Sequence, residues 1–491
     1  MKVVLLVIDS LNRNYLSMYG GTEFKTPNLD RLAGMSAVFE NHYVGTLPTM
    51  PARREMYAGQ MQIFQRPWTP LEPWDKTVTW LMRKHDKMSM LVTDNYHFFE
   101  RGGYNYYTDY SGFEFIRGHE KDAWKTHPID PGPEFDFFLK DQAKRAPYYL
   151  RNVRDFKTEA DFFSPKVMQA TADWIEGNHT HEQFFLVVES FDVHEPFHVP
   201  EPYASMYSDY KGEFTIWPQY TDPMAYPPEM MKHIRAQYGG KMTMLDKWLG
   251  KVFDKMDQHK LWDDTIFIMT SDHGHYLGEH NKTGKNFPFA HNIIAHVPLT
   301  VYMPGGKLNG TRVDALTQTV DLYPTLLEMN GEKQPENTHG ASLMPILKGE
   351  KESVRDAALF GYFRSPVSVT DGKYVLHKWP ATEDGGPVYQ YGVQFEVPGV
   401  LDPLNEVYEK AEVGKYLPHV NFPVYRVPWG SKYNRGNGFD RLFDLTRGEE
   451  EENNIAEEKP DEVKRLEKLL VEEMKKIDAP DEAYVRFGLE K

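Results

Sequence analysis

The sequence predicts an α/β fold in which helices flank a large, mostly parallel central sheet. Four short apolar runs lack polar alternation and end in polar or acidic residues: 3–9, 88–94, 184–190 and 265–272. Such runs are typical of strands that are covered on both faces, as in parallel sheets. Helical patterns lie between these runs, which is the alternation expected of an α/β fold.

Two segments carry clear helical patterns. In 26–35, Thr26 stands at the N-cap position before a proline, and in 235–256 apolar residues recur at spacings of three and four.

Between about 95 and 230 the chain is irregular and rich in Tyr, Phe, Trp and Pro. We expect this stretch to form the walls of a substrate pocket, because long loops on a rigid scaffold are commonly functional. Aromatic packing beneath long loops is the alternative.

A second section begins near residue 355. The segment 365–379 predicts a hairpin that turns at Asp371-Gly372. The segment 460–478 predicts an amphipathic helix, with an apolar stripe formed by Val463, Leu466, Leu470, Met474 and Ile477. We therefore expect a catalytic domain over 1–354 and a smaller subdomain over 355–491.

Composition limits the classes of function. The chain has 491 residues and a formal net charge of −16, which argues against nucleic acid as a partner. A small anionic substrate remains compatible, because one local cluster of cations can outweigh the global sign. There is no cysteine, so disulfides, thiolate metal sites and a cysteine nucleophile are excluded.

The apolar stretch at the start of the chain, 2–10, is interrupted by Asp9 and lacks a small-residue cleavage site. It predicts a buried strand rather than a signal peptide. No run approaches the ~18 apolar residues of a membrane span. We expect a cytoplasmic protein without membrane contact, and a homo-oligomer remains open.

Acidic residues close several of the predicted strands. Asp9, Asp94 and Asp272 each stand at the end of an apolar run, where ligands bind in open α/β sheets. Asp9, Asp272 and His273 offer oxygen and nitrogen ligands suited to one divalent cation. For Asp-His-Gly taken alone, a plain turn is the alternative.

The stretch 47–60 offers hydroxyl, proline and arginine in the order T-x-P-x-R. The hydroxyl of Thr49 would complete the metal site, because a cation loosens its proton and activates it as a nucleophile. If a helix starts here, Pro51 lies in its first turn and the free N–H groups there would face an anion. Arg53 follows one turn later and could hold an oxygen of the substrate.

Three blocks, in this order, resemble the sulfatase family of the alkaline phosphatase superfamily. They are "VIDSLNRNYLSMYGG…TPNLDRLA" with "TMPARREMYAG", then "DDTIFIMTSDHGHYLGEH", and finally "RLFDLTRGEEEENNIAEE". The resemblance implies an alkaline-phosphatase-like sandwich with a smaller C-terminal α+β subdomain that contains an antiparallel sheet. It also implies an enzyme that hydrolyses a small anionic ester.

The resemblance implies further site residues. His194 matches the family's H-x-P histidine, which acts as a general acid or an anion ligand, and Lys285 matches the lysine that binds the transferred group. His97 and Asn95 lie just past a strand end and are candidates for substrate binding. His280 and His291 are weaker candidates, for which a packed or surface position is the alternative.

Two positions depart from the family. The second acidic residue that often follows the first aspartate is here Ser10, as in the phosphonate and phosphodiester hydrolases of the superfamily. At the position of the cysteine or serine that sulfatases oxidise to formylglycine stands Thr49. Oxidation of threonine would give a ketone, so we expect no formylglycine. A threonine adduct must be cleared by attack of water at the central atom, which favours phosphorus over sulfur.

These features lead to three hypotheses. The first is a hydrolase that uses one divalent metal ion (Mn, Ca, Zn or Mg) and a Thr49 adduct to cleave phosphodiesters or phosphonate monoesters. A single metal ion is expected because the sequence lacks the motif D-x-x-G-H, which marks the second metal site of two-metal relatives. The second is a sulfatase that works without formylglycine. The third is a catalytically silent member that binds an anion.

Overall fold

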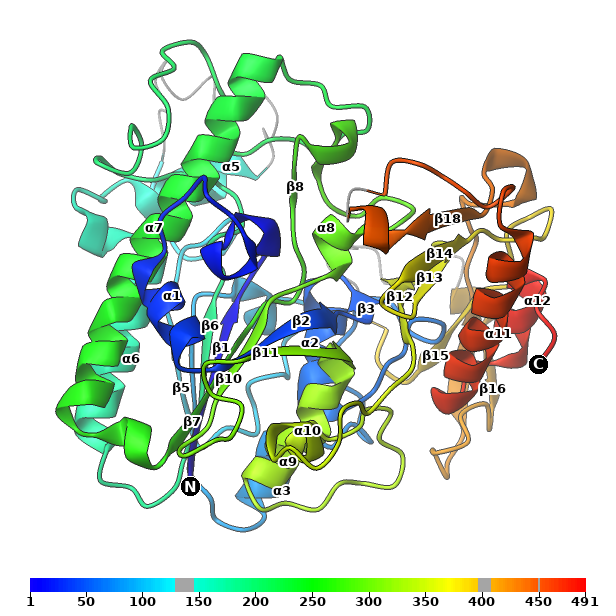
Figure 1. The fold of residues 1–491 in the computed structure, drawn as a ribbon, viewed down its shortest axis with the longest axis horizontal. Helices are drawn as coiled ribbons and strands as arrows, with labels where there is room; N and C mark the ends of the chain where they lie inside the picture. The colour runs from blue at the N-terminus through cyan, green and yellow to red at the C-terminus, as the bar shows by residue number, and fades with distance from the viewer. Residues whose placement is uncertain (129–144, 396–407, 449–450) are drawn as a thin grey trace.

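The computed structural model describes residues 1–128, 145–395, 408–448 and 451–491. Its centre is an eight-stranded sheet in the order β11-β2-β10-β7-β1-β6-β4-β5 (Figure 1). The strands β7, β1, β6, β4 and β5 are mutually parallel, and β10 runs antiparallel to β7 and β2. The predicted fold class is confirmed. The strands are β1 (Lys2–Ile8), β2 (Ala37–Tyr43), β4 (Ser89–Thr93), β5 (Gly112–Phe115), β6 (Phe185–Ser190), β7 (Thr265–Thr270), β10 (Leu299–Tyr302) and β11 (Arg312–Gln318).

Helices cover both faces of this sheet, which is why its strands are apolar throughout. In β1, Val4, Leu6 and Ile8 join one core while Val3, Leu5 and Val7 join the other. The first core includes residues of α1 (Pro27–Gly34), α5 (Ala146–Val153), α6 (Phe163–Asn178) and α7 (Pro228–Gln258). The second includes residues of α2 (Thr49–Ala58), α3 (Val78–Arg83), α9 (Leu322–Met329) and α10 (Met344–Leu347). Parallel strands buried on both sides follow from this layering.

The four predicted strands and both predicted helices are present, with ends that differ by a few residues. The segment 235–256 forms the C-terminal part of α7, which begins at Pro228. The region 95–230 is more ordered than its composition indicated, since it contains β5, α5, α6 and β6. The part of that region between 129 and 144 lies outside the described residues.

A second sheet, of five strands in the order β18-β14-β13-β12-β3, adjoins the first (Figure 1). The predicted hairpin is confirmed as β13 and β14, and the predicted amphipathic helix is α11, which packs against this sheet. Strand β3 comes from the N-terminal part of the chain and pairs in parallel with β12. The boundary at residue 354 remains a prediction. These elements are β3 (Thr46–Leu47), β12 (Ala358–Tyr362), β13 (Val367–Thr370), β14 (Tyr374–Lys378), β18 (Arg441–Asp444), α11 (Pro460–Lys476) and α12 (Asp481–Phe487).

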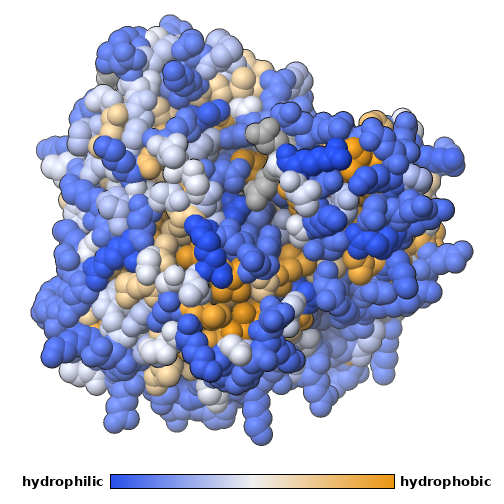
Figure 2. Space-filling view, viewed as in Figure 1, coloured by the Kyte–Doolittle hydropathy of each residue, from blue (hydrophilic) through white to orange (hydrophobic). Residues whose placement is uncertain are grey.

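Smaller elements complete the described part of the chain. A three-stranded sheet has the order β15-β17-β16, and β8 pairs with β9. Figure 2 shows a face that is mostly hydrophilic, with apolar residues gathered near its centre. Among the described helices, none is long and apolar enough to cross a membrane. The bounds are β8 (Tyr276–Leu277), β9 (Thr283–Gly284), α8 (Asn292–Ala295), β15 (Tyr389–Gly392), β16 (Glu412–Gly414) and β17 (Val424–Pro428).

Candidate active site

The carboxyl ends of three neighbouring strands meet the N-terminus of α2. Asp9 follows β1, Glu189 is the penultimate residue of β6, and Asp272 follows β7. Thr49 is the first residue of α2. All of these side chains are buried, with Thr49 1% exposed. The order β7-β1-β6 places the three acids side by side, because parallel strands end at the same edge of the sheet.

Arg53 binds all three of these acids. Its Nη1 lies 2.6 Å from Asp272 and its Nη2 lies 3.1 Å from Asp9. Its Nε and Nη2 donate to Glu189, the latter at 2.6 Å. Nη1 also donates to the main-chain oxygen of Thr49 at 3.1 Å. A guanidinium has five N–H donors, and these bonds use all of them.

Ser10 supports the two aspartates. Its main-chain N–H donates to Oδ1 of Asp272 at 3.1 Å, and its hydroxyl donates to Oδ1 of Asp9 at 2.9 Å. Its backbone is in the left-handed region, with φ of 59°. Ser10 therefore orients both carboxylates through its main-chain N–H and its hydroxyl.

The charges at this point do not balance within the protein. The guanidinium of Arg53 neutralises one of the three buried carboxylates and leaves two negative charges. Burial and the charge of Asp272 raise the pKa of Asp9 well above its ordinary range. For Asp272, burial alone would raise the pKa, but the positive charges of Arg53 and Lys285 help to hold it below the ordinary value. A divalent cation would supply the missing positive charge.

The side chains present fit such a cation. Ligand atoms of Asp9, Asp272 and His273 lie within 4.8 Å of one another. The Nδ1 of His273 donates to the main-chain oxygen of Gly274 at 2.9 Å, which leaves Nε2 as the free ligand atom. Burial lowers the pKa of His273 to about 3, so the ring is neutral and can bind a metal.

Two further groups converge on the same imidazole nitrogen. The Thr49 hydroxyl lies 3.2 Å from Nε2 of His273, and the Lys285 ammonium lies 3.1 Å from it. Lys285 is 4% exposed, and within the described residues no carboxylate lies within 4 Å of its ammonium. A buried ammonium without a carboxylate beside a hydroxyl is an arrangement suited to an anionic substrate.

His194 lies in a second buried group. Its Nδ1 is 3.2 Å from Glu120 and 3.2 Å from Glu195, and its ring stacks on Phe191 at 4.3 Å. Burial and the charge of Lys285 lower the pKa of His194 well below its ordinary value.

The predicted substrate residues Asn95 and His97 lie nearby but already have structural partners. The side chain of Asn95 accepts the main-chain N–H of His97 at 3.1 Å and caps the 3₁₀ turn Tyr96–Phe99. The His97 ring bonds to Glu100 and meets Trp68 edge-on at 4.7 Å. Their roles in substrate binding remain predictions.

Asp94 is separated from the site because β6 lies between β4 and β1. Its Oδ1 accepts the main-chain N–H of Phe191 at 2.6 Å, and it groups instead with His119 and Asp192. The weaker candidates His280 and His291 stack on each other at 4.2 Å, in agreement with the packed alternative.

The sequence interpretation missed Glu189, although the signal was present. The run 184–190 was recognised as a strand that ends in a polar or acidic residue, but only the aspartates were considered as site residues. Glu189 is 0% exposed and also accepts the hydroxyl of Tyr57. No sequence signal pointed to Glu120, which lies after β5 in the irregular region.

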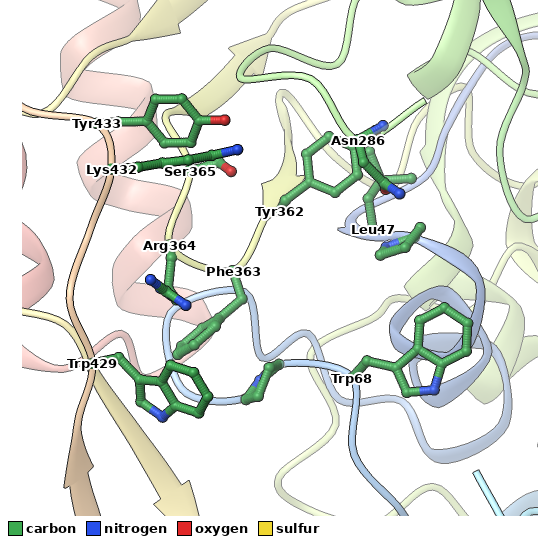
Figure 3. A pocket seen from close by; sticks show the side chains of 12 residues that line it. Leu47, Trp68, Asn286, Tyr362, Phe363, Arg364, Ser365, Trp429, Lys432 and Tyr433 are labelled. Atoms are coloured by element: carbon green, nitrogen blue, oxygen red, sulfur yellow. The ribbon is translucent and has the colours of Figure 1, made fainter. Parts of the chain in front are cut away.

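A cavity of about 470 Å³ lies next to the segment that leads into α2 and is lined there by Leu47 and Pro48 (Figure 3). Its lining includes Pro48 and Asn286, the sequence neighbours of Thr49 and Lys285, but neither of those two residues itself. Figure 3 shows Arg364, Phe363 and Trp429 on one side and Trp68 on the other. None of the lining belongs to 95–230, and the expectation that this region walls the substrate pocket stays a prediction. The full lining is Leu47, Pro48, Pro67, Trp68, Asn286, Tyr362, Phe363, Arg364, Ser365, Trp429, Lys432 and Tyr433.

Comparisons with known proteins agree with this geometry. The family model described as Sulfatase matches residues 2–331. The multifunctional alkaline phosphatase superfamily protein PehA of Trinickia caryophylli is 26% identical over 72% of this chain and 78% of its own length. The arylsulfatase of Clostridium perfringens is 23% identical over 72% and 80%. The crystal structure of the phosphonate monoester hydrolase of Agrobacterium radiobacter has a TM-score of 0.66 at 19% identity, over 97% of this chain and 96% of that one.

Proposed function

Because the chain belongs to the sulfatase family and is an ester hydrolase, we propose that it cleaves phosphodiesters or phosphonate monoesters with Thr49 as nucleophile. The observation that carries this proposal is the convergence of the Thr49 hydroxyl and the Lys285 ammonium on Nε2 of His273, at 3.2 and 3.1 Å. A hydroxyl, a metal ligand and an unpaired cation thus meet at one buried point.

The metal site consists of Asp9, Asp272, His273 and the hydroxyl of Thr49 in this proposal. A bound divalent cation supplies positive charge that lowers the pKa of the threonine hydroxyl and polarises the substrate. Lys285 binds the nonbridging oxygens of the transferred group. Arg53 is a positioning residue, because its five donors are already engaged with the protein. This differs from the substrate contact that the sequence indicated.

The reaction has two steps. Oγ of Thr49 attacks phosphorus, and the bond from phosphorus to the leaving oxygen breaks. The proton lost by the Thr49 hydroxyl passes to that oxygen, with the neutral imidazole of His194 as the relay. Water then attacks phosphorus, and the bond to Thr49 breaks, which restores the hydroxyl. The second step needs an accessible central atom, which supports phosphorus over sulfur, since a sulfo-threonine is harder to clear.

The cavity lined by Leu47 and Pro48 would receive the leaving group. Arg364 lies over the ring of Trp429 at 5.0 Å, and among the described residues no carboxylate pairs with Arg364 or Lys432. Aromatic faces and two free cations favour a leaving group with a planar or sugar-like ring and a negative charge. This supports a substrate larger than a simple methyl ester.

The second candidate is a sulfate ester as substrate. The similarity to an arylsulfatase, 23% identical, is the observation that favours it. The third candidate is a protein that binds an anion without catalysis. The presence of Thr49, of Lys285 and of the acids around Arg53 argues against it.

Rates of ester hydrolysis by the wild-type protein and by two variants of Thr49 test the proposal. We expect metal-loaded protein to hydrolyse aryl phosphodiesters and phosphonate monoesters faster than aryl sulfates. Thr49→Ala should lose about 1,000-fold or more in kcat, because the covalent route is removed, and Thr49→Ser should retain a measurable part. Mass spectrometry of acid-quenched protein should find a phosphoryl adduct on the peptide that contains Thr49.

Full activity in Thr49→Ala would show that Thr49 is not the nucleophile. A preference for sulfate would move the assignment to the second candidate. Equal metal content in all three proteins is the control that separates loss of the nucleophile from loss of the cation.

A further inference from the structure

A buried lysine holds the loop that carries His194. Lys241 belongs to α7 and is 2% exposed, and its ammonium reaches the segment 192–196. It donates to the main-chain oxygen of His194 at 2.7 Å and to that of Pro196 at 2.9 Å. It also lies 2.6 Å from Oδ1 of Asp192. A lysine ammonium has three donors, and these three contacts all end on the same loop.

Asp192 is tied to the rest of the fold at the same time. Its Oδ1 accepts from Nε2 of His119 at 3.1 Å, and its Oδ2 accepts the main-chain N–H of Ser164, in α6, at 3.1 Å. Burial alone would raise the pKa of Asp192, but the charge of Lys241 and the hydrogen bond from His119 hold it below its ordinary value. The ionised carboxylate and Lys241 therefore anchor the loop to both α6 and α7.

These anchors determine where the ring of His194 lies. Its Nδ1 is 2.8 Å from the main-chain oxygen of Glu195. A peptide oxygen only accepts hydrogen bonds, so Nδ1 carries the hydrogen and Nε2 is the atom that can take up and release a proton. The tautomer of His194 is thus set by a main-chain oxygen of the loop that Lys241 holds. The position of this loop therefore sets the position of Nε2.

We propose that Lys241, together with Asp192, is a positioning residue for the proton relay through His194. This role rests on the proposed function, because it requires that His194 passes a proton to the leaving oxygen. A relay works when its atoms come within hydrogen-bond distance, roughly 2.6–3.2 Å. A small displacement of the loop would break this contact. It would leave Thr49 and Lys285 in place, since they belong to other segments of the chain.

A plain ion pair in the core is the competing explanation. A lysine that only balanced the charge of Asp192 would need a single contact. Two of the three contacts of Lys241 end instead on main-chain oxygens, those of His194 and Pro196. Lys2 is a buried lysine of the simpler kind, since it is 6% exposed and lies 2.6 Å from Asp264, at the far end of β1 from the site.

The dependence of the rate on the leaving group tests the proposal. A proton matters for the departure of phenol, a poor leaving group, and matters little for 4-nitrophenol, whose anion is stable by itself. Lys241→Met keeps the length of the side chain and removes all three donors. We expect it to lower kcat/KM about tenfold for phenyl phosphodiesters and less than about twofold for 4-nitrophenyl phosphodiesters. A residue that only supported the fold would lower both rates alike.

Two further variants separate this inference from the proposed function. His194→Ala should lose about 100-fold on phenyl esters and little on 4-nitrophenyl esters. Equal losses on both esters in His194→Ala would show that the relay itself is absent. A selective loss in His194→Ala, with a uniform loss or none in Lys241→Met, would overturn the role of Lys241 alone. Lys2→Met is the matched control and should keep the wild-type ratio of the two rates.

Lys241→Met leaves the carboxylate of Asp192 buried without its cation, which can prevent folding. The double variant Lys241→Met with Asp192→Asn removes both charges, so we expect it to fold, as circular dichroism would show, and to lose activity selectively on phenyl esters. A wild-type ratio of the two rates in the double variant would overturn the proposal. Failure of the double variant to fold would also overturn it, because it would assign the pair to stability.

Discussion

At the scale of single residues, the guanidinium of Arg53 determines how three acids can occupy one edge of the sheet. It donates to Asp9, Glu189 and Asp272 while it is 0% exposed. The fork geometry of arginine makes several charge-assisted bonds at once, which a lysine cannot reproduce. Arg53 therefore fixes the carboxylates before any cation binds.

Glu189→Gln tests this role. The amide removes one charge and directs an NH₂ group towards the N–H donors of Arg53, so we expect a loss of about 3–5 kcal/mol in the free energy of unfolding. Urea denaturation at neutral pH measures it. Glu412→Gln is the matched control, because Glu412 forms an exposed pair with Arg426 and should cost less than about 1 kcal/mol. Equal losses in the two variants would contradict the role assigned to Glu189.

At the scale of elements, the turn between β12 and β13 delivers Arg364 to the cavity. Arg364 has φ of 69°, in the left-handed region that favours glycine. A side chain is therefore held there at a conformational cost, which is common at functional sites. The observed strain supports a role for this residue in binding the leaving group.

Arg364→Gly removes the guanidinium without disturbing this backbone conformation. We expect KM to rise about tenfold for phosphodiesters whose leaving group carries a carboxylate, with little change for uncharged leaving groups. Steady-state kinetics on such a matched substrate pair gives the result. Arg435→Gly is the control, since the side chain of Arg435 is 72% exposed. A uniform effect on both substrates would argue against charge recognition by Arg364.

The elements also show which parts were predictable from sequence. β1, β6 and β7 were identified because continuous apolar runs have few other interpretations, and α11 because its apolar stripe is regular. The helix α6 was missed, because its hydrophobic face is interrupted and it lies in an aromatic-rich region. The acids Asp9 and Asp272 were found from their place after strands, whereas Glu120 has no such local signal.

At the scale of the whole molecule, β3 connects the two large sheets. It ends two residues before Thr49 and pairs with β12 of the C-terminal section. This connection places the cavity residues of 362–365 opposite the start of α2, and no local pattern in the sequence encodes it. The cavity was not predicted for that reason, since it depends on pairing between strands more than 300 residues apart.

The junction contains a buried acid whose ionisation should control global stability. Glu55 accepts the main-chain N–H of Thr46 in β3 and is 0% exposed. Burial raises its pKa from 4.5 to about 8. Between these values the folded state holds a proton that the unfolded chain has released. The contribution of Glu55 is therefore fully favourable below about pH 4.5 and is lost as the pH rises towards 8.

Glu55→Gln should remove this loss, because the amide keeps an acceptor oxygen for Thr46 and carries no charge. We expect the variant to exceed the wild type in free energy of unfolding by roughly 4 kcal/mol more at pH 8.5 than at pH 4.5, from a shift of that size at 1.36 kcal/mol per pKa unit. Chemical denaturation of both proteins at several pH values measures the difference. Buried histidines such as His42, whose pKa is lowered to about 3 by burial, make the folded state more stable as the pH rises. This effect is the same in both proteins, so it cancels in the comparison. Parallel pH profiles would therefore mean that Glu55 is already ionised in the folded protein.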